Sequence, residues 1–184
     1  MAKLCENGIC TPKGFQASGI HCGIRKNRTK KDLALIYSEV PCNAAATYTL
    51  NKVKGAPIAV TKQHLQDGKA QAIICNSGNA NTCNANGVEI ATQMCALCAD
   101  ALQLASEDII VASTGVIGEP LSIDPFATHM QELVTKLSYE GGSDACEGIM
   151  TTDTFKKEFA VSFLLDGKEC HIGGMAKGSG MIHP

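Results

Sequence analysis

The segment QAIICNSGNANTCNANGVEIATQMCALCADALQLASEDIIVAS, Gln71 to Ser113, carries the strongest fold signal in this 184-residue chain. It begins and ends with short, β-branched apolar runs, QAIIC (71–75) and DIIVAS (108–113), which predict two strands. Between them, apolar residues recur near 3.6-residue spacing and predict a helix over about 88–104: Ile90, Met94, Leu97, Cys98, Ala101 and Leu104. Strands and helix in one stretch favour an α/β or α+β fold.

Similar patterns extend outward from this segment. Further strands are expected at 32–39 (DLALIYSE), 46–50 (ATYTL), 56–61 (APIAVT) and 148–152 (GIMTT). A second helix is expected to begin at Asp124, which can cap it, with Pro125 in its first turn. Its apolar stripe runs through Phe126, Met130, Leu133, Val134 and Leu137.

The end of the chain predicts a hairpin. Residues 158–165 alternate apolar and polar, and Asp166-Gly167 offers a tight turn into a strand over 168–172. No linker, repeat or low-complexity segment divides the chain, so residues 1–184 are expected to form a single domain.

Composition narrows the class of protein. A hydrophobic content of 45% with 18% charged residues is typical of a soluble globular protein with a substantial core. The net charge is −2 and the densest basic cluster is Arg28, Lys30 and Lys31, which gives little support to nucleic-acid or membrane binding. The first ten residues lack the apolar run of a signal peptide, and no stretch approaches the roughly 18 apolar residues of a spanning helix, so a cytoplasmic location is expected.

The ten cysteines are expected to be reduced and structural, because no export signal accompanies them. Cys95 and Cys98 form a CxxC inside a helical pattern, which favours core packing over a zinc or redox site. The histidines show no metal-ligand spacing, and no metal site is expected: His21, His64, His129, His171 and His183.

Three polar segments at strand or loop ends are candidates for a site. CNSGNAN (75–81) is either a hydrogen-bonded structural loop or an anion-binding nest. Thr114-Gly115 could aim a hydroxyl and an amide at an oxyanion, or form an ordinary strand end. The hydroxyls of TTDT (151–154) could hold a polar substrate or line a sheet edge, and Lys177, in a glycine-rich loop, could pair with a carboxylate or remain a solvated surface cation.

These candidates lack a nucleophile with its base. The chain contains no GxSxG, Walker loop or dinucleotide fingerprint. The inference is that the nucleophile lies on another chain.

Six ordered blocks, spread over nearly the whole chain, resemble the α chain of ornithine acetyltransferases, the bifunctional glutamate N-acetyltransferases of arginine biosynthesis. They are TPKGFQASGIHCGIRKNRTKKDLALI, APIAVTKQHL, AIICNSGNANTC, VASTGVIGEPL, IMTTDTF and KGSGMI. The resemblance implies an αββα sandwich like that of N-terminal-nucleophile aminopeptidases, completed by a separate β chain.

By the same resemblance, the chain is the N-terminal product of a precursor that cuts itself just beyond KGSGMIHP (177–184), before a threonine that becomes the β-chain nucleophile. Thr114 and Gly115 match the oxyanion hole, and Thr154 and Lys177 match substrate-binding positions. The implied reaction moves acetyl from N-acetylornithine to glutamate through an acyl-threonine in an α₂β₂ assembly. It requires no cofactor, although acetyl-CoA is a further candidate donor.

Two rival functions remain open from the sequence. One is an amidohydrolase or aminopeptidase of the same fold, with water as acceptor. The other is a non-enzymatic binding or structural subunit, suggested by the missing nucleophile.

Overall fold

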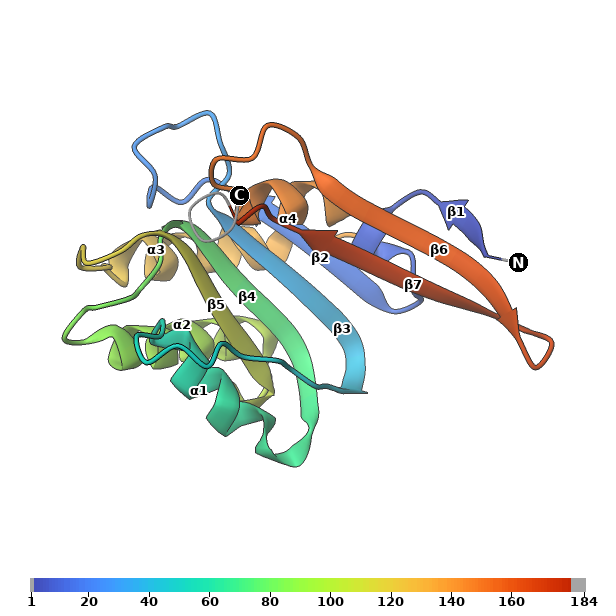
Figure 1. Ribbon diagram of the computed structural model, residues 1–184, viewed down its shortest axis with the longest axis horizontal. Helices are drawn as coiled ribbons and strands as arrows, with labels where there is room; N and C mark the ends of the chain where they lie inside the picture. Colours follow the sequence, from blue (N-terminus) through green and yellow to red (C-terminus); the bar gives the residue numbers. More distant parts are fainter. Residues whose placement is uncertain (1, 180–184) are drawn as a thin grey trace.

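The computed structural model describes residues 2–179, which contain two β-sheets and four α-helices (Figure 1). The larger sheet has the strand order β2-β3-β4-β5, with bounds Phe15–Ile20, Leu33–Asn43, Lys69–Asn79 and Ile109–Val116. Its first three strands are antiparallel neighbours, whereas β4 and β5 run parallel. The parallel pair brings the carboxyl ends of β4 and β5 to the same edge of the sheet.

Helix α2, Gly87–Leu102, makes the crossover between β4 and β5. A parallel pair needs a long connection, and an amphipathic helix of 16 residues supplies it while covering the sheet. The segment 71–113 therefore folds as a β-α-β unit at the β5 edge of the larger sheet.

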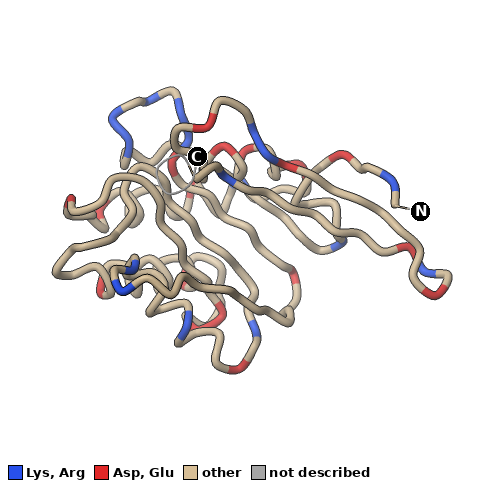
Figure 2. The backbone as a smooth tube through the Cα atoms, in the orientation of Figure 1, with Lys and Arg blue, Asp and Glu red and all other residues tan. Residues whose placement is uncertain are grey.

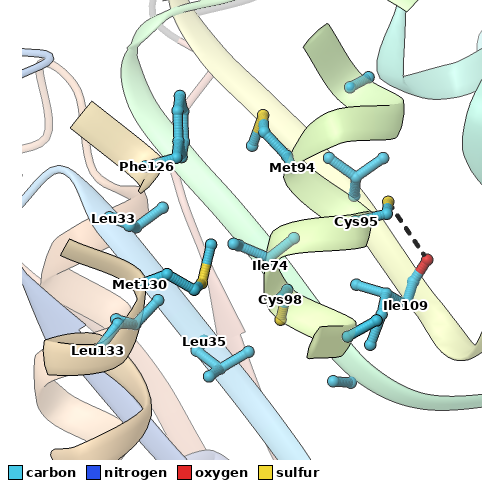
Figure 3. Packing of buried hydrophobic residues seen from close by; sticks show 14 of the residues in the cluster. Leu33, Leu35, Ile74, Met94, Cys95, Cys98, Ile109, Phe126, Met130 and Leu133 are labelled. Carbon is cyan, nitrogen blue, oxygen red and sulfur yellow. Dashed lines mark hydrogen bonds between the residues drawn. The ribbon is translucent and has the colours of Figure 1, made fainter. Parts of the chain in front are cut away.

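Helices α1 (Pro57–His64), α2 and α3 (Asp124–Thr135) cover one face of the larger sheet. Leu33, Leu35 and Ile74 of the sheet pack against the apolar stripes of α2 and α3 (Figure 3). The helical partners in this core include Met94, Cys95, Cys98, Phe126, Met130 and Leu133. Full burial of each large side chain contributes roughly 1.5–3 kcal/mol, so this cluster is the main source of stability.

Helix α4, Gly142–Ile149, covers part of the opposite face. Small residues dominate this contact, with Ala17, Ala34 and Ala145 at most 1% exposed. A Cβ on Gly19 would lie 2.0 Å from the carbonyl oxygen of Asp144, so glycine is required for this close approach. The apolar cluster around α4 is smaller than the main core. Polar side chains, including Ser77 and Thr114, occupy the same sheet face at the carboxyl ends of β4 and β5.

The second sheet has the order β1-β6-β7, with bounds Lys3–Cys5, Lys157–Leu165 and Lys168–Ala176. Asp166 and Gly167 both have positive φ, 50° and 77°, as the tight turn between β6 and β7 requires. One face of this sheet packs on the short 3₁₀ segment η1 (Gly8–Cys10). Two other 3₁₀ turns, η2 (Leu65–Asp67) and η3 (Ser106–Asp108), precede β4 and β5.

Most of the elements predicted from the sequence are confirmed, including both helices, the final hairpin and the strands at 32–39, 71–75 and 108–113. The expected strand at 56–61 is wrong, because this segment begins α1 with Pro57 in the first turn. Its side chains anchor a helix to β5: Thr61 Oγ1 donates to the Val111 carbonyl at 2.8 Å, and His64 Nδ1 lies 2.8 Å from the Ile109 carbonyl.

Two further strand predictions are also wrong. Residues 46–50 belong to an exposed connection, where Leu50 is 96% exposed. Residues 148–152 contain the end of α4 and the loop after it, and the Gly148 carbonyl accepts a hydrogen bond from Ser77 at 2.6 Å. The sequence also missed α4, β1 and β2, since glycine and short length conceal their patterns.

The cysteine pair in α2 packs as predicted. Cys95 and Cys98 are fully buried in the main core, and burial raises the pKa of each thiol to about 12. All ten cysteines are free thiols. None of the helices in residues 2–179 has the length and apolar character needed to cross a membrane.

Candidate functional site

The candidate site begins where β4 and β5 end. The register places Ser77 beside Thr114 and Gly78 beside Gly115, and a bulge follows at Asn79. Since side chains alternate along a strand, Thr114 shares a sheet face with Ser77 and Cys75, on the side that carries α4. Ser113 pairs with Asn76 and belongs to the opposite, helix-covered face.

Gly115 brings two backbones unusually close together. Its φ is 135°, a value that L side chains rarely adopt, and a Cβ there would lie 2.3 Å from the carbonyl carbon of Gly78. The strand end therefore presents backbone beside the Thr114 hydroxyl group, with no side chain at position 115. A hydroxyl and a neighbouring amide are the donors that an oxyanion requires.

The CNSGNAN segment has the contacts of the structural alternative. Its first five residues belong to β4, and the buried amide side chains of Asn79 and Asn81 bond to the backbone. Asn79 Nδ2 donates to the Glu119 carbonyl at 3.0 Å, and Asn81 Nδ2 donates to the Gly87 carbonyl at 2.8 Å. These bonds fix the connections on both sides of the strand ends.

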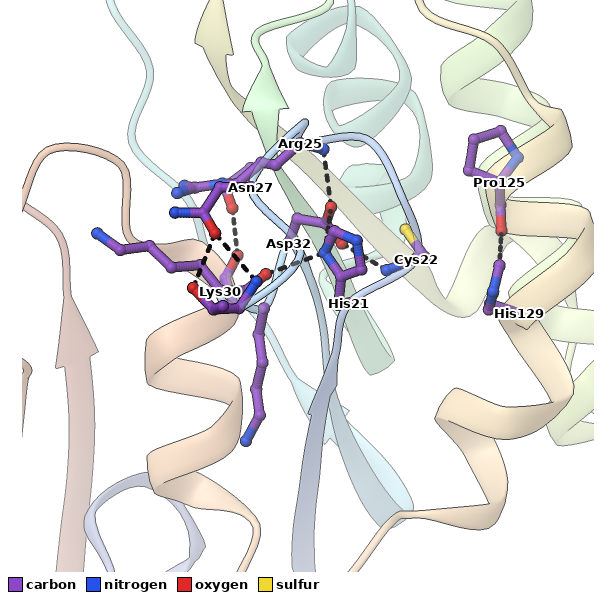
Figure 4. Close-up of polar contacts among 12 residues, drawn as sticks. His21, Cys22, Arg25, Asn27, Lys30, Asp32, Pro125 and His129 are labelled. Atoms are coloured by element: carbon purple, nitrogen blue, oxygen red, sulfur yellow. Dashed lines mark hydrogen bonds and ion pairs between the residues drawn. The ribbon is translucent and has the colours of Figure 1, made fainter.

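A loop over residues 21–31 packs against the same edge and is organised by the buried Asp32 carboxylate (Figure 4). Asp32 accepts hydrogen bonds from the Cys22 amide at 2.6 Å and the Arg25 amide at 2.8 Å, and His21 Nδ1 lies 3.2 Å from it. The Arg25 guanidinium group then donates to the Met150 carbonyl oxygen. Arg25 thus links this loop to the segment that carries Thr154.

Asp153 joins the TTDT segment to the end of β7. Its Oδ1 accepts from the Gly178 amide at 2.5 Å and from Lys157 Nζ at 2.8 Å, and its Oδ2 accepts from the Thr151 amide at 3.2 Å. Burial opposes ionisation of this carboxyl, but these donors hold its pKa well below the usual range. The Asp153 side chain, 2% exposed, is therefore a fixed anion between the two segments.

Lys177 follows β7 directly and lies at this junction. Its Nζ donates to the Gly178 carbonyl at 2.7 Å, and within residues 2–179 no carboxylate lies within ion-pair distance of it. Burial raises the pKa of the Cys75 thiol to about 12, and the nearby positive charge of Lys177 opposes that rise. Lys177 is therefore near the sheet face that carries Thr114, with charge available for a ligand.

Of the site residues predicted from the sequence, some lie close together in the fold and others do not. Thr114 and Gly115 are adjacent at the end of β5, and Lys177 follows β7 and is near enough to Cys75 of β4 for its charge to act on that thiol. Thr154 is exposed and is connected to Lys177 through its neighbour Asp153. The end of the KGSGMIHP stretch, residues 180–184, lies outside the described residues.

Sequence reasoning missed Arg25, Asp32 and Asp153. Arg25 belongs to a run of charged residues that is typical of a solvated loop, and Asp32 precedes an apolar strand like any boundary residue. Only their buried contacts distinguish them. Within residues 2–179, no three His, Cys, Asp or Glu side chains are grouped so that they could hold a metal ion.

Positive charge gathers beside this edge. Figure 2 shows Lys and Arg residues along the loop over residues 25–31. The Arg25 side chain connects this loop to the Met150 carbonyl by a hydrogen bond. The cationic residues of the loop are Arg25, Lys26, Arg28, Lys30 and Lys31. This cationic loop, together with Lys177, which has no carboxylate partner among residues 2–179, favours small anionic ligands such as carboxylates at this edge.

Solved structures share this fold. The chain matches the crystal structure of the arginine biosynthesis bifunctional protein ArgJ from Bacillus halodurans with a TM-score of 0.92 and 41% identity, over 100% of this chain and 97% of that chain. It matches ornithine acetyltransferase from Mycobacterium tuberculosis, solved with ornithine, with a TM-score of 0.91 and 35% identity, over 100% and 98% of the two chains. The mixed α/β fold is therefore of the N-terminal-nucleophile-like class seen in these proteins, as predicted.

The sequence comparisons identify the family. The ArgJ family model matches residues 16–184. The arginine biosynthesis bifunctional protein ArgJ of Caldanaerobacter subterraneus subsp. tengcongensis is 48% identical over 183 residues, and that of Symbiobacterium thermophilum is 48% identical over 179 residues. The chain belongs to the ArgJ family, which confirms the resemblance of the six sequence blocks.

The alignment covers nearly all of this chain but less than half of each relative. It covers 99% of this chain but 45% of the Caldanaerobacter protein, and 96% of this chain but 44% of the Symbiobacterium protein. The chain therefore spans less than half the length of these curated relatives.

Proposed function

We propose that this chain is the α subunit of a glutamate N-acetyltransferase that transfers acetyl from N-acetylornithine to glutamate in arginine biosynthesis. The observation that carries the proposal is the position of Thr114 and Gly115 together at the end of β5, in a chain that belongs to the ArgJ family. Lys177, directly after β7, adds a positive charge near Cys75 of the neighbouring strand. The ornithine acetyltransferase with the same fold, solved with ornithine, supports the choice of substrate.

The catalytic nucleophile is proposed to be the N-terminal threonine of a β chain, released when a precursor cuts itself shortly after residue 184. The relatives supply a length argument for two chains. This chain covers 97–98% of chains in two related crystal structures, but 45% of the Caldanaerobacter protein. We further propose that α and β chains assemble as an α₂β₂ heterotetramer in the cytoplasm.

The reaction proceeds in two acyl-transfer steps. The threonine Oγ attacks the acetyl carbonyl of N-acetylornithine, and the hydroxyl proton passes through the threonine α-amine to the amine of ornithine. Ornithine then departs, and the acetyl group remains on the threonine as an ester. The amine of glutamate then attacks that ester, N-acetylglutamate leaves, and the threonine hydroxyl is restored. Both steps form a tetrahedral oxyanion.

In the proposed mechanism, residues of this chain stabilise the oxyanion and bind the substrate. The Thr114 hydroxyl and Gly115 amide donate to the oxyanion, where one lost donor costs about 3–4 kcal/mol in comparable enzymes. Lys177, which lacks a carboxylate partner within residues 2–179, pairs with a substrate carboxylate. Thr154 hydrogen-bonds the bound amino acid. The mechanism requires no cofactor, and acetyl-CoA is an alternative acetyl donor.

The test begins with the full-length encoded protein. Intact-mass measurement is expected to reveal two chains separated by a cut immediately before a threonine. The purified assembly should convert N-acetylornithine and glutamate to ornithine and N-acetylglutamate, and acetyl-CoA is offered separately as donor.

Other outcomes support the rival functions. Release of free acetate or of a cleaved peptide, without acetylation of glutamate, would indicate the amidohydrolase or aminopeptidase. Binding of an acetylated amino acid without turnover would indicate a binding subunit. Full activity after the β-chain threonine is blocked would refute the acyl-threonine mechanism.

A further inference from the structure

The side chain of Arg25 lies against the place where β4 and β5 touch most closely. The register pairs Gly78 with Gly115, and a Cβ on Gly115 would lie 2.3 Å from the Gly78 carbonyl carbon. Gly78 has positive φ, 101°, and a Cβ there would lie 2.8 Å from Arg25 Cγ and 3.1 Å from Ile24 Cγ2. Gly78 therefore contacts Gly115 through its carbonyl group and Arg25 at its α-carbon.

Arg25 is held at both its backbone and its guanidinium group. Its amide donates to Oδ2 of Asp32 at 2.8 Å, and Asp32 is fully buried (Figure 4). Its guanidinium group donates to the Met150 carbonyl oxygen. The apolar stem between these two attachments is the part that packs on Gly78, so it has little freedom to move away.

The segment that accepts this hydrogen bond is itself attached to β4. Ser77, the neighbour of Gly78, donates from Oγ to the Gly148 carbonyl at 2.6 Å. The contacts therefore form a closed path, which runs from Ser77 to Gly148, along the chain to Met150, through Arg25 and back to Gly78. A closed path of this kind resists displacement of the strand end.

Stability alone does not explain an arginine at this position. Its Nε is buried and has no hydrogen-bond partner within residues 2–179, and no carboxylate in that part of the chain lies within ion-pair distance of Arg25. A buried donor without a partner reduces the stability of the folded state. Such groups call for an explanation, and a functional role is one.

We propose that Arg25 is a positioning residue for the oxyanion hole. Its side chain holds Gly78 against Gly115 and thereby fixes the direction of the Gly115 amide. The inference rests on the proposed function, which assigns that amide to the oxyanion. Arg25 acts through Gly78 and does not contact substrate.

The first test measures acetyl transfer by the full-length protein. Arg25→Met keeps an apolar stem but loses the guanidinium donors, whereas Arg25→Lys keeps both a stem and a donor for the Met150 carbonyl. Lys13→Met, which changes an exposed cation in the turn before β2, is the matched control.

Arg25→Met should lower kcat about tenfold and change KM for N-acetylornithine and glutamate less than about threefold, because a misplaced donor affects the transition state. Arg25→Lys should retain at least about half of kcat, and the control should match the unchanged protein. An unchanged kcat in Arg25→Met would overturn the proposal. A raised KM with unchanged kcat would also overturn it, because Arg25 would then bind a substrate carboxylate.

Hydrogen exchange measures the positioning itself. Amides in peptides covering residues 113–118 should exchange at least about threefold faster in Arg25→Met than in the unchanged protein, while peptides from α3 keep their rate. Equal exchange at residues 113–118 would contradict the role of Arg25. Faster exchange throughout the chain would indicate general destabilisation and would contradict it as well.

The two proposals fail separately. If the unchanged protein lacks acetyl transfer but the faster exchange is confined to residues 113–118, the proposed reaction is wrong and Arg25 still positions Gly115. If acetyl transfer occurs and Arg25→Met matches the unchanged protein in kcat and in exchange, the reaction stands and the role of Arg25 is wrong.

Discussion

At the scale of single residues, Asp153 illustrates how a buried carboxylate can organise a site. It binds the Gly178 and Thr151 amides and Lys157 Nζ, so it connects segments that meet only after folding. The side chains proposed to contact substrate, Thr154 and Lys177, are next to these bonded positions. In the proposed site, Asp153 would therefore act on substrate only through the placement of its neighbours.

Asp153→Asn is expected to destabilise the protein by about 2 kcal/mol at pH 7, because charge-assisted hydrogen bonds are lost from a buried group. The pKa of Asp153 is lowered in the folded state, so its stabilisation is complete above about pH 5 and declines as the pH falls below about 4. Urea unfolding at pH 7 and pH 3 should show the gap between parent and variant narrowing at pH 3.

Asp100→Asn, an exposed change on α2, is the control and should leave stability nearly unchanged at both pH values. A gap of the same size at pH 7 and pH 3 would contradict a role for the Asp153 charge.

Thr114 permits a sharper chemical prediction. If both acetyl transfer and self-cleavage use its hydroxyl group, Thr114→Ala should slow each by about 10²–10³-fold, and Thr114→Ser should retain most of both rates. Intact-mass time courses and an acetyl-transfer assay measure the two reactions. Unchanged rates in both reactions would remove Thr114 from the oxyanion role.

At the scale of elements, the end of β5 depends on its contact with β4. The parallel register aligns Gly115 with Gly78, and the bulge at Asn79 follows immediately. Bulges often lie next to active sites, where they redirect a strand. Here the bulge ends the regular register just beyond the positions that carry Thr114 and Gly115.

Gly115→Ala should disturb this contact more than a matched glycine change elsewhere. Gly118 also has positive φ, 81°, but a Cβ there meets no atom within 4 Å, whereas one at Gly115 meets the Gly78 backbone. Gly118→Ala is expected to cost about 1 kcal/mol from backbone strain, and Gly115→Ala at least about 1 kcal/mol more. Thermal or urea unfolding of both variants measures the difference, and equal losses would contradict the close approach.

At the scale of the whole molecule, the core divides the cysteines into distinct environments. Cys95 and Cys98 are fully buried between α2 and the larger sheet, whereas Cys83 is exposed after the end of β4. Because the thiolate is the reactive form, burial and a raised pKa both suppress reaction.

Thiol labelling of the folded chain at pH 8 should therefore modify Cys83 rapidly and spare Cys95 and Cys98 until the chain unfolds. Peptide mapping after timed labelling identifies each site, and Cys83→Ser should remove the rapid reaction at that position. Labelling of Cys95 or Cys98 at the same rate in folded and unfolded protein would contradict their burial.

The sequence by itself determined the features that depend on local pattern. Periodicity located α2, α3, β4 and β5, because an amphipathic helix and a buried strand repeat their apolar residues at characteristic intervals. The six ordered blocks determined the family, and with it the expectation that Thr114, Gly115, Thr154 and Lys177 belong to one site.

Only the tertiary structure decided the features that depend on distant partners. APIAVT became a helix because Thr61 and His64 could bond to the carbonyls of β5, although its local composition favoured a strand. Arg25 and Asp153 became part of the site through contacts more than twenty residues away in sequence, which no local pattern records. In the sequence, the apolar residues of β6 and β7 alternate as in any strand pair with one buried face, so the pattern predicts that their face is covered. Its exposure could be seen only once the opposite face was known to pack on η1.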